Sequence, residues 1–249
     1  NSGTLLKIGH KTFVTGCYGT KEWADKVEEL EKRQLSLGAK GTFFDQLGCG
    51  FKLCFDNTHS HGTRIDQDPD LRLQAIKRMR GNLGEDDWFG TEWVDDRITP
   101  EMDFTHGYGV SIEYAPDAYP YLFRYTFPEC TVSNRLIHDE KEGWEKHLNY
   151  AFVHGMIFDV GLWRCRIKSI DDLPNYGNKI KALIDLRKEY LDFFTLGKFD
   201  MLDPPKGVWG AKYTYNGKSI AALWNDADAD FVMNGQTIAP NEVKVICID

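Results

Sequence analysis

The sequence predicts an α/β protein: part of a TIM-type (β/α) barrel followed by a small antiparallel β domain. Two observations lead to this expectation. Short apolar segments of strand character alternate with amphipathic helical segments over the first 204 residues. After Pro204-Pro205, short strands are separated by Asn-Gly pairs at 216–217 and 234–235, which are typical of β-hairpins. We therefore expect a barrel region at 1–204 and an antiparallel domain at 205–249.

The barrel is expected to be incomplete. We count about five strand–helix repeats before the β domain, whereas a closed barrel needs eight and roughly 250 residues. The sequence also begins with Asn rather than Met. These features predict that the first barrel strands are missing, and that an N-terminal segment of a longer protein or a second chain completes the barrel.

The elements follow from local signals. Thr20 can cap a helix that ends before Gly38, and Pro69 can open the next helix. The expected helices are 21–37, 69–83, 140–155 and 176–196. The expected strands are 11–17, 41–45, 87–92, 121–127 and 156–159 in the barrel, then 208–215, 219–224, 230–233 and 243–248. The long connections 47–68 and 94–119 have little apolar periodicity, and loops of that length in a compact domain are usually functional.

Composition excludes several classes of partner. The net charge is −8 and the basic residues are scattered, so nucleic acid is not an expected partner. No apolar run is long enough to cross a bilayer. Cysteines stand at 17, 49, 54, 130, 165 and 247, without a Cys-x-x-Cys pair or a zinc spacing. We therefore expect free thiols, no resident metal and no cofactor.

Two of the expected strands end in a carboxylate. Asp45 follows Gly41-Thr-Phe-Phe, and Glu92 follows Trp88-Phe-Gly-Thr. A strand end is rigid, so it holds an acid in a fixed direction. Two facing carboxyls are what cleavage of a glycosidic bond requires, one as proton donor and the other as nucleophile or base. Gln46 is a candidate for binding substrate hydroxyls, and Trp93 could exclude water from Glu92 and raise its pKa.

The stretch from Cys54 to Gly62 is a second informative cluster, with Asp56, His59 and His61 as its candidates. The His-x-His pair could bind sugar hydroxyls, orient Asp45, or hold a divalent metal with nearby acids. Ordinary loop chemistry is a further alternative.

Two more residues are candidates for substrate binding. Arg124 lies in the expected aromatic strand 121–127, where a buried guanidinium would need a carboxylate partner such as Asp45 or Glu92. Asp159 ends the expected strand 156–159.

The succession FFDQLG, CFD-x-x-HSHG and GTEW resembles a group of glycoside-hydrolase-like barrels. More distantly, it is similar to the retaining α-glycosidases of the α-amylase type and to the endo-α-N-acetylgalactosaminidases. The resemblance implies Asp45 as nucleophile and Glu92 as acid/base in hydrolysis of an oligosaccharide or glycan, without a cofactor. The chain departs from the amylase pattern at Phe43, where an Arg is usual.

Two alternatives stay open at this point. His59 and His61, with Asp45 or Glu92, could form the centre of a metal-dependent hydrolase. The chain could also be a carbohydrate-binding protein without catalysis, because aromatic residues near the mouth of a barrel serve binding equally well.

Overall fold

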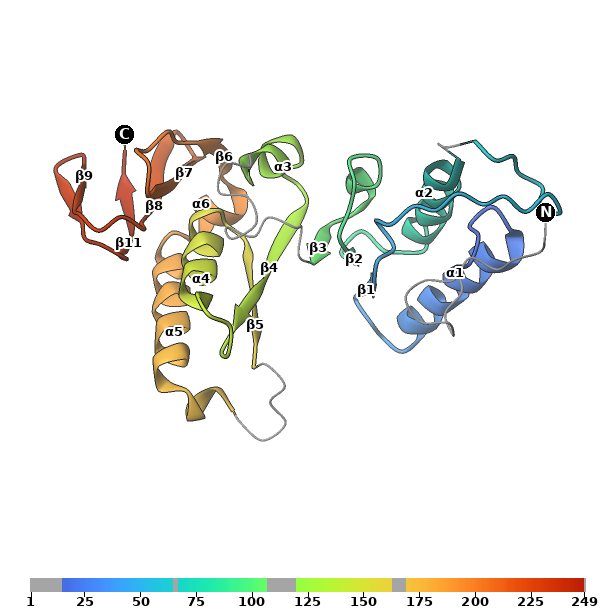
Figure 1. The fold of residues 1–249 in the computed structure, drawn as a ribbon, viewed down its shortest axis with the longest axis horizontal. Helices are drawn as coiled ribbons and strands as arrows, with labels where there is room; N and C mark the ends of the chain where they lie inside the picture. Colours follow the sequence, from blue (N-terminus) through green and yellow to red (C-terminus); the bar gives the residue numbers. More distant parts are fainter. Residues whose placement is uncertain (1–14, 65–66, 107–119, 163–168, 249) are drawn as a thin grey trace. The chain divides into compact units, whose positions relative to one another are not determined.

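A computed structural model describes residues 15–64, 67–106, 120–162 and 169–248 of the chain. The chain divides into two compact units, Asn1–Thr105 and His106–Asp249, and each is described by itself (Figure 1). The predicted domain division after residue 204 stays a prediction. None of the helices in these ranges is long and apolar enough to span a membrane.

The first unit is built from two strand–helix repeats. Its elements are α1 (Lys21–Ser36), β1 (Gly41–Phe44), α2 (Gln67–Arg80), β2 (Trp88–Glu92), the 3-10 helix η1 (Thr99–Glu101) and β3 (Phe104–His106), whose last residue begins the second unit. β1 and β2 pair in parallel, with Gly41 aligned to Trp88 and Phe44 to Thr91. This parallel pairing agrees with the predicted barrel, because two parallel strands need a long crossover connection, here α2.

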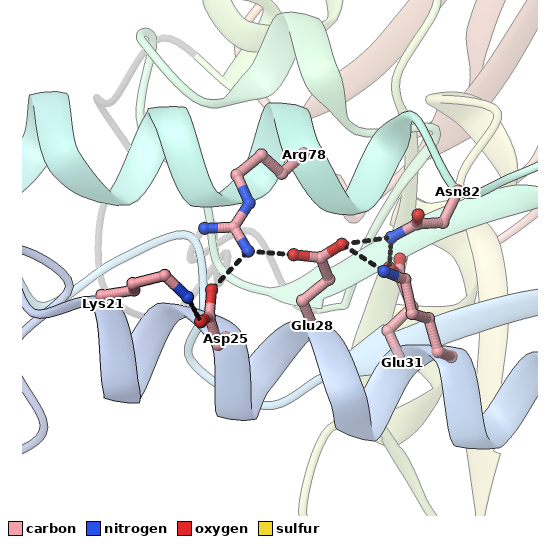
Figure 2. A network of polar contacts seen from close by, with 7 residues as sticks. Lys21, Asp25, Glu28, Glu31, Arg78 and Asn82 are labelled. Atoms are coloured by element: carbon pink, nitrogen blue, oxygen red, sulfur yellow. Dashed lines mark hydrogen bonds and ion pairs between the residues drawn. The ribbon is translucent and has the colours of Figure 1, made fainter.

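A polar network joins α1 to α2 (Figure 2). Its members are Lys21, Asp25, Glu28, Glu31 and Lys32 from the first helix, with Arg78 and Asn82 from the second helix and the turn after it. Asn82 donates to Glu31 at 2.9 Å and to Glu28 at 3.3 Å. Glu31 is fully buried, whereas the Glu28 side chain keeps 13% of its surface exposed.

The second unit contains another strand–helix–strand repeat. Its elements before the antiparallel sheet are α3 (Pro120–Thr126), β4 (Thr131–His138), α4 (Trp144–Val153), β5 (Ile157–Gly161), the 3-10 helix η2 (Ile170–Asp172), α5 (Pro174–Glu189) and α6 (Leu191–Leu196). β4 and β5 are parallel, and α4 packs on both (Figure 1). Every residue of α4 from His147 to Val153 is buried, so this helix is the centre of the core of the second unit.

The C-terminal part is an antiparallel sheet, as predicted. Its strands are β6 (Lys198–Met201), β7 (Val208–Tyr215), β8 (Lys218–Asn225) and β11 (Val243–Cys247), in the order β11-β8-β7-β6. A separate hairpin pairs β9 (Phe231–Met233) with β10 (Gln236–Ile238). Asn216 and Asn234 have φ of 49°, each followed by a glycine with positive φ, which is the backbone that tight hairpin turns require.

The structure differs from several sequence expectations about elements. Residues 121–127 lie largely in the helix α3 instead of a strand: Pro120 occupies its first turn, and the aromatic residues that favour a strand pack at helical spacing, Phe123 against Phe127. The expected loop 94–119 contains η1 and β3, and the helix expected at 176–196 is interrupted at Tyr190. The strand at 131–138 was not predicted. Of the expected strand 11–17, residues 11–14 lie outside the described residues, and 15–17 form no strand.

We predict opposite effects on stability from Glu28→Gln and Glu31→Gln. Hydrogen bonds from Lys32, Arg78 and Asn82 lower the pKa of Glu28 to about 2, so its charge stabilises the fold above the ordinary pKa and this contribution is lost as the pH falls toward 2. Burial raises the pKa of Glu31, so its charge destabilises the fold above the raised pKa, and this penalty disappears on acidification.

Urea unfolding at pH 7 should therefore show Glu28→Gln about 1 kcal/mol less stable than the natural protein. Glu31→Gln should be more stable than the natural protein, because the amide can still accept from Asn82 without a buried charge. Both differences should shrink as the pH falls through the respective pKa. A change in the free energy of unfolding at pH 7 that has the same sign in both variants would contradict this prediction.

Candidate active site

The two predicted acids stand side by side at the carboxyl ends of β1 and β2. Phe44 and Thr91 are the last aligned pair of the two strands, so Asp45 and Glu92 occupy the next position in each. Asp45 is exposed and Glu92 is buried, with 8% of its surface accessible. In parallel barrels the side chains at this edge of the sheet form the active site.

Both strands bend directly after their acid. Gln46 has φ of 53° and Trp93 has φ of 58°, so the residue that follows each carboxylate adopts a left-handed conformation. Such a conformation costs a residue with a side chain about 1–2 kcal/mol, so surrounding contacts must hold it. Pairing then resumes at Gly48 and Val94, which form a parallel bridge. Each acid therefore lies between two fixed points of its strand.

Thr91 provides the contact that fixes this bend. Its side chain is fully buried, and its hydroxyl donates to the carbonyl of Phe44 at 2.8 Å and accepts from the amide of Gly48 at 3.1 Å. A side chain at Gly48 would come within 2.4 Å of the carbonyl of Trp93, so this position requires glycine. The approach of the two strand ends depends on both residues.

Cys49 lies within the influence of both acids. Its thiol is 3.9 Å from the carbonyl of Glu92 and 4.0 Å from that of Gln46. Burial raises the pKa of the Cys49 thiol, and the charges of Glu92 and Asp45 raise it further, against the effect of Arg72. The two carboxylates therefore act on the same sulfur, as expected of side chains that share one edge of the sheet.

Arg72 of α2 holds the loop that follows Asp45. Its guanidinium is buried and donates to the carbonyls of Leu47 at 3.2 Å and Cys49 at 2.6 Å. Asp68 accepts from the same group at 3.0 Å and compensates its charge. This role was not predicted, because an Arg in a helix rich in charged residues is usually exposed at the surface.

The remaining candidates near the acids are Gln46 and Trp93. Gln46 is exposed, and Trp93 keeps 48% of its surface accessible beside the buried Glu92. An accessible indole next to a carboxyl suits the apolar face of a sugar ring.

His59 and His61, in the loop between β1 and α2, have cysteines as neighbours instead of the expected acids. His61 Nε2 is 3.1 Å from the sulfur of Cys17, and His59 Nδ1 is 3.3 Å from that of Cys54. Within the described ranges, the group that could hold a metal consists of these four residues, without Asp45 or Glu92. The sequence did not reveal it, because Cys17 is remote from the other three. The metal-dependent hydrolase hypothesis paired the two histidines with Asp45 or Glu92, whereas in the structure they are grouped with two cysteines.

Asp56 has a local role in that loop. It accepts from the amide of Thr58 at 2.9 Å and from its hydroxyl at 2.7 Å, and these bonds lower the pKa of the Asp56 carboxyl. The carboxylate thereby closes the turn that leads to His59.

Arg124 and Asp159 belong to the second unit. Arg124 lies in α3, where it donates to the carbonyl of Cys130 at 3.3 Å and stands 5.5 Å from the centre of the Phe199 ring. Asp159 lies inside β5 instead of at its end, and pairs with His106 at 3.1 Å. Asp139 was not among the predicted candidates, although it directly follows β4 as Asp45 follows β1.

No family model matches the chain, and neither does any curated protein. Solved structures do match. The α-amylase from H. orenii is 14% identical with a TM-score of 0.55, over 86% of this chain and 56% of its own. The cyclic α-maltosyl-(1→6)-maltose hydrolase from Arthrobacter globiformis, in complex with maltose, is 11% identical with a TM-score of 0.60, over 92% and 61%. The α-N-acetylgalactosaminidase NagBb from Bifidobacterium bifidum is 14% identical with a TM-score of 0.54, over 90% and 35%.

These similarities confirm the predicted fold class. The chain has the fold of part of an amylase-type barrel followed by the antiparallel sheet found in such proteins, and it is distantly similar to glycoside hydrolases. It spans 56% of the amylase chain it matches, so it corresponds to only part of that protein.

We predict that the Thr91 hydroxyl contributes to stability through the two backbone groups it bonds. Thr91→Val keeps the shape but leaves the carbonyl of Phe44 and the buried amide of Gly48 without this partner, which should cost about 2 kcal/mol. Thr91→Ser keeps the hydroxyl and loses one methyl group, which should cost about 1 kcal/mol. Urea unfolding measures both, and a valine variant at least as stable as the serine variant would contradict the role of the hydroxyl.

Proposed function

We propose that the chain is part of a retaining glycoside hydrolase that acts on an oligosaccharide or glycan. The observation that supports this most is the placement of Asp45 and Glu92 at the same position of two aligned parallel strands. The fold, which is that of part of an amylase-type barrel, adds to it. Because the chain spans only part of the proteins it matches, the proposal concerns the activity of the whole protein.

In the first step, Glu92 gives its proton to the glycosidic oxygen while a carboxylate oxygen of Asp45 attacks the anomeric carbon. The bond from that carbon to the leaving oxygen breaks and an ester to Asp45 forms. In the second step, Glu92 takes a proton from water, the water oxygen bonds to the anomeric carbon, and the ester bond to Asp45 breaks. Two inversions give net retention of configuration.

The structure of each acid supports its role. Glu92 is buried at the end of β2, and we assign it the role of general acid. Asp45 is exposed directly after β1, where a substrate can reach its carboxylate, and we assign it the role of nucleophile. Trp93 and Gln46, held by the backbone immediately after the acids, would bind a sugar ring and its hydroxyls.

The proposal is tested on the full-length natural protein with a panel of aryl α-glycosides of glucose, galactose and N-acetylgalactosamine. Proton NMR of the first product should show the anomeric configuration of the substrate. A product of opposite configuration would contradict the retaining mechanism. Binding of the sugars without turnover of any member of the panel would instead indicate a carbohydrate-binding protein.

We predict that Asp45→Asn and Glu92→Gln each lower kcat by at least about 100-fold on substrates with poor leaving groups. Asp86→Asn, an exposed acid outside both strands, is the matched control and should keep full activity. Azide should rescue Glu92→Ala with a glycosyl azide of retained configuration, and Asp45→Gly with one of inverted configuration. Rescue products of the same configuration in both variants would contradict the assigned roles.

A further inference from the structure

The first unit contains a cluster of two cysteines and two histidines that the proposed mechanism does not use: Cys17, Cys54, His59 and His61. The sulfur and ring-nitrogen atoms of these residues all lie within 4.8 Å of one another. Cys17 comes from the turn before α1, and the other three come from the loop between β1 and α2. The cluster therefore joins two segments that are remote in sequence.

The distances suit a tetrahedral metal ion. Zinc binds sulfur at about 2.3 Å and nitrogen at about 2.0–2.1 Å, so a sulfur and a nitrogen on one zinc are about 3.6 Å apart. The two sulfur–nitrogen pairs of the cluster are 3.1 and 3.3 Å apart, close to that separation without the metal.

One ring nitrogen of each histidine faces a cysteine of the cluster, and the other nitrogen lies near a second partner. His61 donates from Nδ1 to the carbonyl of Gly62 at 2.6 Å, which leaves Nε2 as the acceptor that faces Cys17. In His59 the arrangement is reversed: Nε2 lies 3.8 Å from Asp56, and Nδ1 faces Cys54. A second partner on the outer nitrogen is the usual arrangement of histidines that bind metals, because it fixes the tautomer and the ring orientation.

We propose that these four residues bind a structural zinc ion that fastens the loop between β1 and α2 to the turn before α1. Two cysteines and two histidines are a ligand set typical of zinc, and two thiolates balance its charge. With four protein ligands no position is left for water or substrate, so the site is structural instead of catalytic. The histidines are then unavailable to substrate, and the site does not depend on the proposed function.

The loop between β1 and α2 gives a metal site an energetic role. The stretch from Phe51 to Gly62 has no helix or strand, and many of its side chains are accessible. A segment of this kind buries little apolar surface to offset its conformational entropy, and the free energy of metal binding can supply the difference.

The test measures metal content and coordination in the full-length natural protein, purified without chelator. Elemental analysis should find one zinc per chain. Replacement by cobalt(II) should give the intense visible bands of tetrahedral cobalt and a near-ultraviolet band from thiolate to metal.

Cys54→Ser and His61→Asn should weaken zinc binding by at least about tenfold, and Asp56→Asn by about tenfold through the orientation of His59. Cys247→Ser, an exposed free thiol in the second unit, is the matched control and should keep full zinc binding.

A chelator should lower Tm in the natural protein and in Cys247→Ser, and added zinc should restore it. These readouts do not use catalysis, so the proposal can fail or succeed independently of the glycosidase assignment. Absence of zinc together with the pale spectrum of octahedral cobalt would overturn the proposal. A mass spectrum that shows a disulfide between Cys17 and Cys54 in the purified protein would overturn it as well.

Discussion

The Thr91 hydroxyl ties the carboxyl ends of β1 and β2 together, and the placement of both acids depends on this contact. It is buried and bonds the backbone before Asp45 and the backbone after it. The left-handed bends at Gln46 and Trp93 can persist because pairing is fixed on both sides of them. The strand ends thereby hold the two acids at the same position of neighbouring strands.

The loop after Asp45 is secured in stages. Arg72 binds the carbonyls of Leu47 and Cys49 close to the acid, and the Cys17, Cys54, His59 and His61 cluster holds the far part of the loop. Both anchors are polar, and they act on a stretch that has no helix or strand between Phe51 and Gly62. The proposed zinc would thus act on the candidate site only by limiting the motion of the loop that begins there.

Sequence reasoning found the elements whose signals are local. The apolar run 41–44 is followed by an acid and the run 88–92 ends in one, and the Asn-Gly pairs mark tight turns in the C-terminal part. It failed where tertiary packing decides: residues 121–127 have strand propensity but lie largely in α3, and Asp139 was missed together with β4. The cysteine–histidine cluster was invisible because Cys17 meets its partners only in the folded chain.

The proposed mechanism requires a covalent bond between Asp45 and the sugar. The most direct measurement is to incubate the full-length natural protein with 5-fluoro-α-glycosyl fluorides of glucose, galactose and N-acetylgalactosamine, and to locate the trapped sugar by peptide mass spectrometry. We expect a glycosyl ester on the peptide that contains Asp45, and its loss in Asp45→Asn. A label on another carboxylate, or turnover without any covalent adduct and with inversion of configuration, would contradict it.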